Sequence, residues 1–251
     1  MKLAIIGDPV QHSRSPLLHR NFLDESEIDG SYVAIRVPAT HAAATIREMR
    51  RDGFTGCNVT YPLKEEALDA CDVLTQEARR SLAVNTILFG RDVVGTNTDG
   101  IGARMAIEAL IDEPIALKRI GILGYGATAR AILAELHDND AYAFVWGRDA
   151  ARVRTVCERF EAEAWPAENL PEIVVSTLPP DAVLPKDLVA DLQGPEVVVD
   201  VNYGNRATLA RQIDREVVTG DAMLEAQAHA SFDFWLAHLD GLSGASKSPV
   251  I

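Results

Sequence analysis

Asn58, Thr60 and Lys64 are three side chains that can hydrogen-bond or move a proton, and they follow one another closely. Residues 54–60 are apolar and β-branched enough for a short strand, and Pro62 suits the first turn of a following helix. Asn58 and Thr60 then share one strand face. In a first helical turn the helix dipole would lower the pKa of Lys64 and suit it to proton transfer. An ordinary turn with a solvated lysine is the alternative.

Asp99 is the natural partner for such a lysine. It follows a short strand predicted at 93–95, and a carboxylate beside Lys64 would form a charge-balanced proton-transfer pair. The alternative role for Asp99 is an N-cap on a helix that opens at Ile101.

Two hydroxyls, Ser13 and Ser15, follow a buried strand predicted at 3–7. Pro16 suits the start of a helix, so Ser15 can be its N-cap instead of a ligand contact. Ser13 has no such local role, and we expect it to contact a ligand.

A glycine-rich loop follows a second buried strand at 119–123 and precedes a helix predicted at 130–136. In this G-x-G-x-x-A pattern the glycines permit a tight turn and let a pyrophosphate approach the backbone N–H groups of the helix. A further strand, at 142–146, follows the glycine loop and helix at the distance expected for a dinucleotide-binding unit. The pattern predicts dinucleotide binding by Gly124, Tyr125, Gly126, Ala127, Thr128 and Ala129.

The segment Gly147-Arg148-Asp149 after that strand bears on the choice of cofactor. Arg148 can pair with the 2′-phosphate of NADP through its planar guanidinium. Asp149 can instead accept a hydrogen bond from the free ribose hydroxyl of NAD. Because Arg148 comes first after the strand, NADP is favoured and NAD stays open.

Other segments alternate between strand and helix patterns, which predicts an α/β protein. Strands are expected at 31–37, 84–89, 173–178 and 197–201, with helices at 40–52, 100–111 and from about 225. The tail from Ser243 to Ile251 is expected to fray.

Composition narrows the function. The 251 residues suit two modest domains, and the net charge of −13 argues against nucleic acid and anionic membranes as partners. No segment reads as a signal peptide or a membrane span. Three scattered cysteines without a C-x-x-C pair favour a reduced cytoplasm and no structural metal.

Taken in order, these segments resemble the shikimate dehydrogenases, which reduce 3-dehydroshikimate to shikimate with NADPH in chorismate and aromatic amino acid biosynthesis. The resemblance spans nearly the whole chain. It is carried by 7–16, 56–64, 83–86, 97–100, 200–208 and 223–228.

The resemblance implies two domains around a central cleft. One is an open α/β substrate-binding domain at 1–101 plus 225–251, and the other is a Rossmann-type NADP-binding domain at 102–224. It implies that Lys64 and Asp99 are catalytic. The substrate would be bound by Ser13, Ser15 and Tyr203 at its carboxylate, and by Asn58, Thr60, Asn85, Asp99 and Gln227 at its ring hydroxyls and carbonyl. The cofactor would also contact Thr177, Val201, Gly220 and Met223.

The chain departs from the family pattern where the cofactor is expected. The family usually has Asn before Arg148 and Thr or Ser after it, whereas this chain has Gly147 and Asp149. A quinate/shikimate dehydrogenase or a paralogue acting on a related cyclic hydroxy acid with NAD is the nearest alternative. A non-catalytic nucleotide or metabolite sensor is another, although such a sensor needs no Lys64–Asp99 pair. The partner is a small-molecule substrate, and monomer and homodimer stay open.

Overall fold

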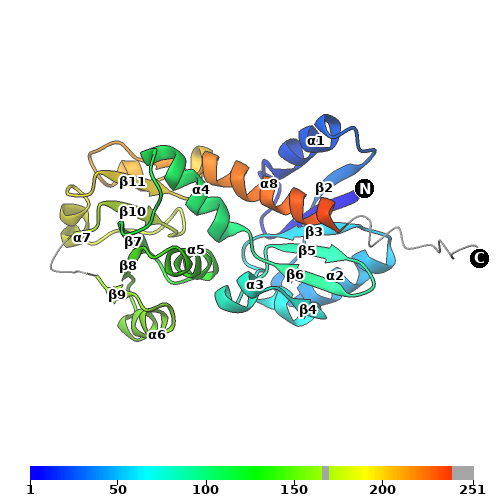
Figure 1. Ribbon diagram of the computed structural model, residues 1–251, viewed down its shortest axis with the longest axis horizontal. Coiled ribbons are helices and arrows are strands. Elements are labelled where there is room, and N and C mark those ends of the chain that lie inside the picture. Colours follow the sequence, from blue (N-terminus) through cyan, green and yellow to red (C-terminus); the bar gives the residue numbers. More distant parts are fainter. Residues whose placement is uncertain (166–169, 239–251) are drawn as a thin grey trace, which may run out of the picture. The chain divides into compact units, whose positions relative to one another are not determined.

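The computed structural model describes residues 1–165 and 170–238, and the chain divides into two compact units (Figure 1). The first unit comprises Met1–Arg79, Ala83–Asn97 and the described residues from Ala228 onward. The second comprises Arg80–Leu82 and the described residues of Thr98–Gln227. The predicted fraying of the tail from Ser243 lies outside the described residues. No helix in the described ranges is long and apolar enough to cross a membrane.

The first unit is built on a six-stranded sheet in the order β2-β1-β3-β5-β6-β4. Its strands are β1 (Lys2–Gly7), β2 (Ser31–Arg36), β3 (Gly56–Val59), β4 (Val73–Leu74), β5 (Thr86–Phe89) and β6 (Val93–Thr96). β1 runs parallel to β2 and β3, whereas β5 is antiparallel to both β3 and β6. The chain reverses after Phe89, so β5 and β6 form a hairpin.

Both faces of this sheet are covered, because successive side chains of a strand point to opposite sides. Leu3 and Ile5 of β1 pack with α1 (Ser15–Glu25) and the end of α8 (Asp221–Ala237). Ala4 and Ile6 pack on the other side with α2 (Ala42–Arg51), which follows a 3₁₀ turn at Ala39–His41, and with the 3₁₀ helix η2 (Glu66–Ala70). The short helix α3 (Gln76–Ser81) precedes β5.

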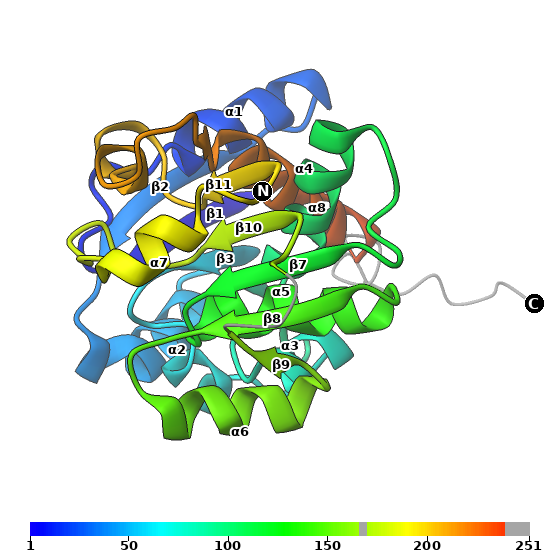
Figure 2. The ribbon, with the colours of Figure 1, turned by 90° about the vertical axis from the view of Figure 1, so that its left-hand side faces the viewer.

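The second unit has a parallel six-stranded sheet in the order β12-β11-β10-β7-β8-β9. The strands are β7 (Arg119–Leu123), β8 (Tyr142–Trp146), β9 (Glu163–Ala164), β10 (Ile173–Ser176), β11 (Val197–Asp200) and β12 (Val218–Thr219). Read from β9 to β12, this order is that of a doubly wound dinucleotide-binding sheet. The topological switch point lies between β7 and β10. Figure 2 looks onto this sheet and shows the strands from β11 to β9 in sequence.

Helices cover both faces of the second sheet. Ile120, Ile122 and Val145 face α4 (Asp99–Ile111), α5 (Ala127–Asp138) and α6 (Ala150–Phe160). Val174 and Val198 face α7 (Lys186–Asp191), which lies in front of the sheet in Figure 2. Two 3₁₀ turns, Gly204–Arg206 and Leu209–Arg211, connect β11 to β12.

Candidate active site

One end of the first sheet gathers polar side chains from segments that are far apart in the sequence. Ile6 of β1 pairs with Val59 of β3, and Asn58 pairs with Thr86 of β5. Because β5 runs antiparallel to β3, its first residues lie beside the last residues of β1 and β3. This end carries six predicted site residues, namely Ser13, Ser15, Asn58, Thr60, Lys64 and Asn85.

Lys64 lies half-buried in a turn at this end, and its carbonyl accepts a hydrogen bond of 2.8 Å from the N–H of Val84. The helix expected to start at Pro62 is wrong: residues 61–65 form turns, and η2 follows as a 3₁₀ helix. The turn closes with a bond from the N–H of Leu63 to the carbonyl of Thr60 (2.9 Å), and Leu63 is fully buried in the core. Lys64 therefore precedes η2 and does not lie in the first turn of an α-helix.

Asn58 is held at both ends of its amide by buried groups. The hydroxyl of Tyr32 donates to Oδ1 of Asn58 at 2.6 Å. Nδ2 of Asn58 donates to the carbonyl of Asn85 (3.2 Å), Oγ1 of Thr86 (3.1 Å) and Oγ of Ser231 (3.1 Å). Burial raises the pKa of Tyr32 well above its usual value, so the phenol stays a neutral donor.

The two serines form a compact local pair. Oγ of Ser13 accepts from the N–H of Ser15 and donates to Oγ of Ser15, both at 3.2 Å. Arg14 is the N-cap of α1 and Ser15 is its first residue, so the expectation that Ser15 caps this helix is wrong. Ser15 is buried and Ser13 half-buried.

Thr60 is positioned by close packing against β1. Its N–H donates to the carbonyl of Ile6 at 2.9 Å, and a Cβ at Gly7 would lie 2.4 Å from Cγ2 of Thr60. A side chain at Gly7 would therefore displace Thr60.

Asp99, Tyr203 and Gln227 belong to the second unit. Asp99 is buried and is the first residue of α4, with Thr98 at the N-cap, so the predicted N-cap role of Asp99 is wrong by one position. Its carboxylate stands in the first turn of α4, which is favourable for an anion. Nε2 of Gln227 donates to the carbonyl of Leu224 (2.8 Å), and the carbonyl of Gln227 accepts from Oγ1 of Thr98 (3.0 Å). Tyr203 is half-buried just after β11.

The glycine loop between β7 and α5 contains two glycines, and the protein structure itself requires glycine only at the first. Gly124 has a φ of +118°, and a Cβ there would lie 2.4 Å from Oγ1 of Thr177. Gly126 has an ordinary φ of −76°, and a Cβ there would meet nothing within 4 Å. Among the described residues no side chain caps α5. The open space at Gly126, in front of an uncapped helix start, fits the pyrophosphate of a dinucleotide.

Asp149 is engaged by the protein itself. It is the N-cap of α6, where its Oδ1 accepts from the N–H groups of Ala151 (3.0 Å) and Arg152 (3.2 Å). Oδ2 of Asp149 lies 3.5 Å from Nε of Arg152. Arg148 is exposed beside it. Arg152 is a candidate that sequence reasoning missed, although its place one helical turn after Arg148 was a usable signal.

The remaining predicted cofactor residues lie at the carboxyl ends of β10, β11 and β12. Oγ1 of Thr177 donates to the carbonyl of Leu123 at 2.9 Å and so links β10 to β7. A Cβ at Gly220 would lie 2.1 Å from the carbonyl oxygen of Val201, so the two backbones touch. Met223 is buried in the core of the second unit.

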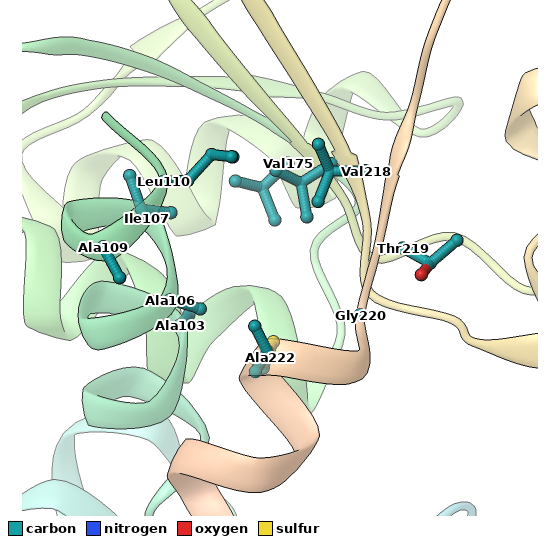
Figure 3. A pocket seen from close by; sticks show the side chains of 12 residues that line it. Ala103, Ala106, Ile107, Ala109, Leu110, Val175, Val218, Thr219, Gly220 and Ala222 are labelled. Carbon is teal, nitrogen blue, oxygen red and sulfur yellow. The ribbon is translucent and has the colours of Figure 1, made fainter. Parts of the chain in front are cut away.

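A cavity of about 220 Å³ lies beside Gly220 and Met223, between α4, the sheet and the start of α8. Figure 3 shows Ile107 and Leu110 of α4 and Val175 and Val218 of the sheet pointing into it. The cavity is lined almost wholly by aliphatic groups, so it cannot recognise a polyhydroxylated substrate.

The described residues form neither a metal site nor a reactive thiol. No group of three or more His, Cys, Asp or Glu side chains there is arranged to hold a metal ion. Burial raises the pKa of Cys71 to about 12, and burial likewise raises the pKa of Cys57, so neither thiol is a nucleophile at neutral pH.

Comparison with known proteins connects both units to one family. A family model described as the shikimate dehydrogenase substrate binding domain matches residues 5–87. Shikimate dehydrogenase (NADP(+)) of a Thermus thermophilus strain is 34% identical over 263 residues, covering 99% of this chain and 97% of that protein. The enzyme of the same name from Herminiimonas arsenicoxydans is 32% identical and covers 94% and 83%, respectively.

A solved structure matches over nearly the full length of the chain. Shikimate 5-dehydrogenase of Thermus thermophilus, in complex with NADP(H) and shikimate, has a TM-score of 0.81 and 32% identity over 94% of each chain. A doubly wound nucleotide unit, together with a unit that gathers hydroxyl, amide and ammonium groups at one sheet end, defines a dinucleotide-dependent oxidoreductase. The relatives specify which one: the chain belongs to the shikimate dehydrogenase family.

Proposed function

We propose that this protein catalyses the reversible, NADP-dependent reduction of 3-dehydroshikimate to shikimate, a step in chorismate and aromatic amino acid biosynthesis. The observation that carries the proposal is the convergence of Ser15, Asn58, Thr60 and Lys64 at one end of the first sheet. A relative that aligns over nearly the full chain is named shikimate dehydrogenase (NADP(+)). The solved relative holds NADP(H) and shikimate.

The cofactor supplies the hydride, and the protein supplies binding, orientation and a proton. Lys64, as an ammonium, donates a hydrogen bond to the ring carbonyl oxygen and transfers a proton to it as the alkoxide forms. In the oxidative direction its neutral amine takes the hydroxyl proton. Asp99 balances the charge of Lys64 at the reacting oxygen.

The other polar residues bind the substrate in this proposal. Ser13, Ser15 and Tyr203 hold the carboxylate, and Asn58, Thr60, Asn85, Asp99 and Gln227 bind the ring hydroxyls and carbonyl. The functional division into a substrate domain at 1–101 plus 225–251 and a nucleotide domain at 102–224 is part of the proposal, as are the central cleft and a cytoplasmic location. The part of the substrate domain beyond residue 238 lies outside the described residues.

The preference for NADP over NAD is supported by Asp149. Its carboxylate caps α6 and lies beside Arg152, so it already has partners within the chain. Arg148 and Arg152 bring two guanidinium groups to the end of β8, where they can offset the net charge of −13 for a phosphorylated ligand.

The first test measures reduced-nicotinamide absorbance with shikimate or quinate, each with NADP⁺ or NAD⁺. We expect the fastest turnover with shikimate and NADP⁺. Replacement of Lys64 by Ala should lower kcat by about 10²–10⁴, the usual contribution of a general acid–base, with a smaller change in KM. Lys186→Ala, at an exposed position on α7, is the matched control and should leave both constants unchanged.

Two results would overturn this proposal. A raised KM with kcat intact in Lys64→Ala would make Lys64 a binding group only. Absence of turnover with every substrate and cofactor pair would favour the sensor.

A further inference from the structure

The ring of Tyr125 fills the space that a side chain at Gly147 would need, at the ends of two neighbouring strands. Leu123 of β7 pairs with Trp146 of β8, so the loops that follow run side by side. A Cβ at Gly147 would lie 2.4 Å from Cδ1 and 2.5 Å from Cε1 of Tyr125. The φ of Gly147 is outside the left-handed region. Glycine is therefore required at 147 for the room that it leaves to the Tyr125 ring, and not for its backbone conformation.

Arg152 lies near both this ring and a carboxylate. Its guanidinium carbon is 5.8 Å from the centroid of the Tyr125 ring, and its Nε is 3.5 Å from Oδ2 of Asp149. Asp149 is itself fixed by two N–H groups at the start of α6. The Arg152 side chain is nevertheless 71% exposed, so it is accessible to a ligand.

We infer that Tyr125 positions Arg152 for the 2′-phosphate of NADP, and that Gly147 is side-chain-free so that the ring can lie there. The inference rests on the proposed function. A guanidinium that stacks on an aromatic ring loses less freedom when it pairs with a phosphate, because its planar donors are already oriented. The departure from the family's usual Asn at position 147 thus has a steric cause at Tyr125.

The test is a double-mutant cycle read by binding. Dissociation constants for NADP⁺ and NAD⁺ are measured by isothermal titration calorimetry, and their ratio isolates the contribution of the 2′-phosphate. Tyr125→Ala should reduce the preference for NADP⁺ by about two- to fivefold, the range of an exposed cation–π pair. Tyr125→Phe keeps the ring and should preserve the preference. Arg152→Ala should reduce it as well, and adding Tyr125→Ala to Arg152→Ala should change nothing further.

A second cycle addresses Gly147. Gly147→Ala should displace the ring and reduce the NADP⁺ preference as Tyr125→Ala does. In the Tyr125→Ala background the same change should leave the preference unchanged, because only the milder approach to Cγ2 of Val153 (3.1 Å) remains. Thermal melts followed by circular dichroism establish that each variant is folded.

The outcomes separate this inference from the proposed function. Additive effects of Tyr125→Ala and Arg152→Ala, or an unchanged preference in Tyr125→Ala, would overturn the positioning role and leave NADP-dependent turnover of shikimate intact. A wild-type protein that binds both cofactors equally would overturn the inference and the NADP assignment together. In that case, turnover of shikimate with NAD⁺ would still support the proposed reaction.

Discussion

At the scale of single residues, Asn58 illustrates how a site group is held in one orientation. The hydroxyl of Tyr32 donates to its carbonyl, and three acceptors surround its amide nitrogen. An amide held in this way cannot flip to exchange its donor and acceptor without leaving a buried group unpaired. In the proposed site, the first sheet therefore presents Asn58 in one fixed orientation.

Removal of the Tyr32 hydroxyl tests this arrangement. Tyr32→Phe leaves Oδ1 of Asn58 buried without its donor, which should lower the free energy of unfolding by about 1–3 kcal/mol. Because Asn58 then loses its fixed orientation, KM for shikimate should rise more than kcat falls. Urea unfolding and steady-state kinetics measure the two effects. Tyr142→Phe, at an exposed tyrosine of the second unit, is the control. An unchanged KM would show that Tyr32 does not orient Asn58.

At the scale of elements, the loop between β7 and α5 separates structural from ligand requirements. Gly124 has a left-handed φ and sits against Thr177, so the chain itself requires glycine there. Gly126 is required neither by its φ nor by its neighbours. Space left open at a helix start is the feature that a bound pyrophosphate would use.

These two glycines should respond in opposite ways to alanine. Gly124→Ala should lower the melting temperature, since a Cβ at positive φ costs about 1–2 kcal/mol before its clash with Thr177 is counted. Gly126→Ala should melt like the wild type but bind NADP⁺ about tenfold or more weakly, because charge-assisted hydrogen bonds of about 1.5–3 kcal/mol are lengthened. Wild-type affinity in a folded Gly126→Ala would contradict the loop's role in binding the pyrophosphate.

At the scale of the whole molecule, the stability of the first unit depends on one histidine that stays uncharged. His19 is fully buried and stacks on Tyr32 at a centroid distance of 4.4 Å. Burial, and then repulsion from His229, lowers the pKa of His19 from 6.5 to about 3. The unfolded chain therefore binds a proton at this position between about pH 6.5 and pH 3 that the folded chain does not, and stability falls as the pH falls through that range.

The expected slope is about 1.4 kcal/mol per pH unit below the unfolded pKa. Urea unfolding at pH 7 and pH 5 should show this loss for the wild type and a smaller one for His19→Phe, which keeps an aromatic ring but has no proton to gain. His12→Phe, at an exposed loop position, should lose stability as the wild type does. Equal losses in wild type and His19→Phe would mean that the buried histidine does not stay neutral.

Features encoded within a few neighbouring residues were predictable from the sequence. The strands β7 and β8, the hairpin of β5 and β6 and the glycine loop follow from apolar runs and turn residues that are adjacent in the chain. Strands β4, β9 and β12 have two residues each, so they show no periodicity and form only because a neighbouring strand pairs with them.

Features that depend on distant residues were decided by the tertiary structure. The turns at 61–65 replace the expected helix where Leu63 enters the core. Tyr32 and Ser231, which are 26 and 173 residues away in the sequence, hydrogen-bond to Asn58. Tyr125, which follows the neighbouring strand, leaves no room for a side chain at Gly147. By itself the sequence specified which reactive side chains are present and which strands carry them, because residue type and strand formation are local properties. Which side chains hold one another in place depends on burial and packing, which arise only when the sheets assemble.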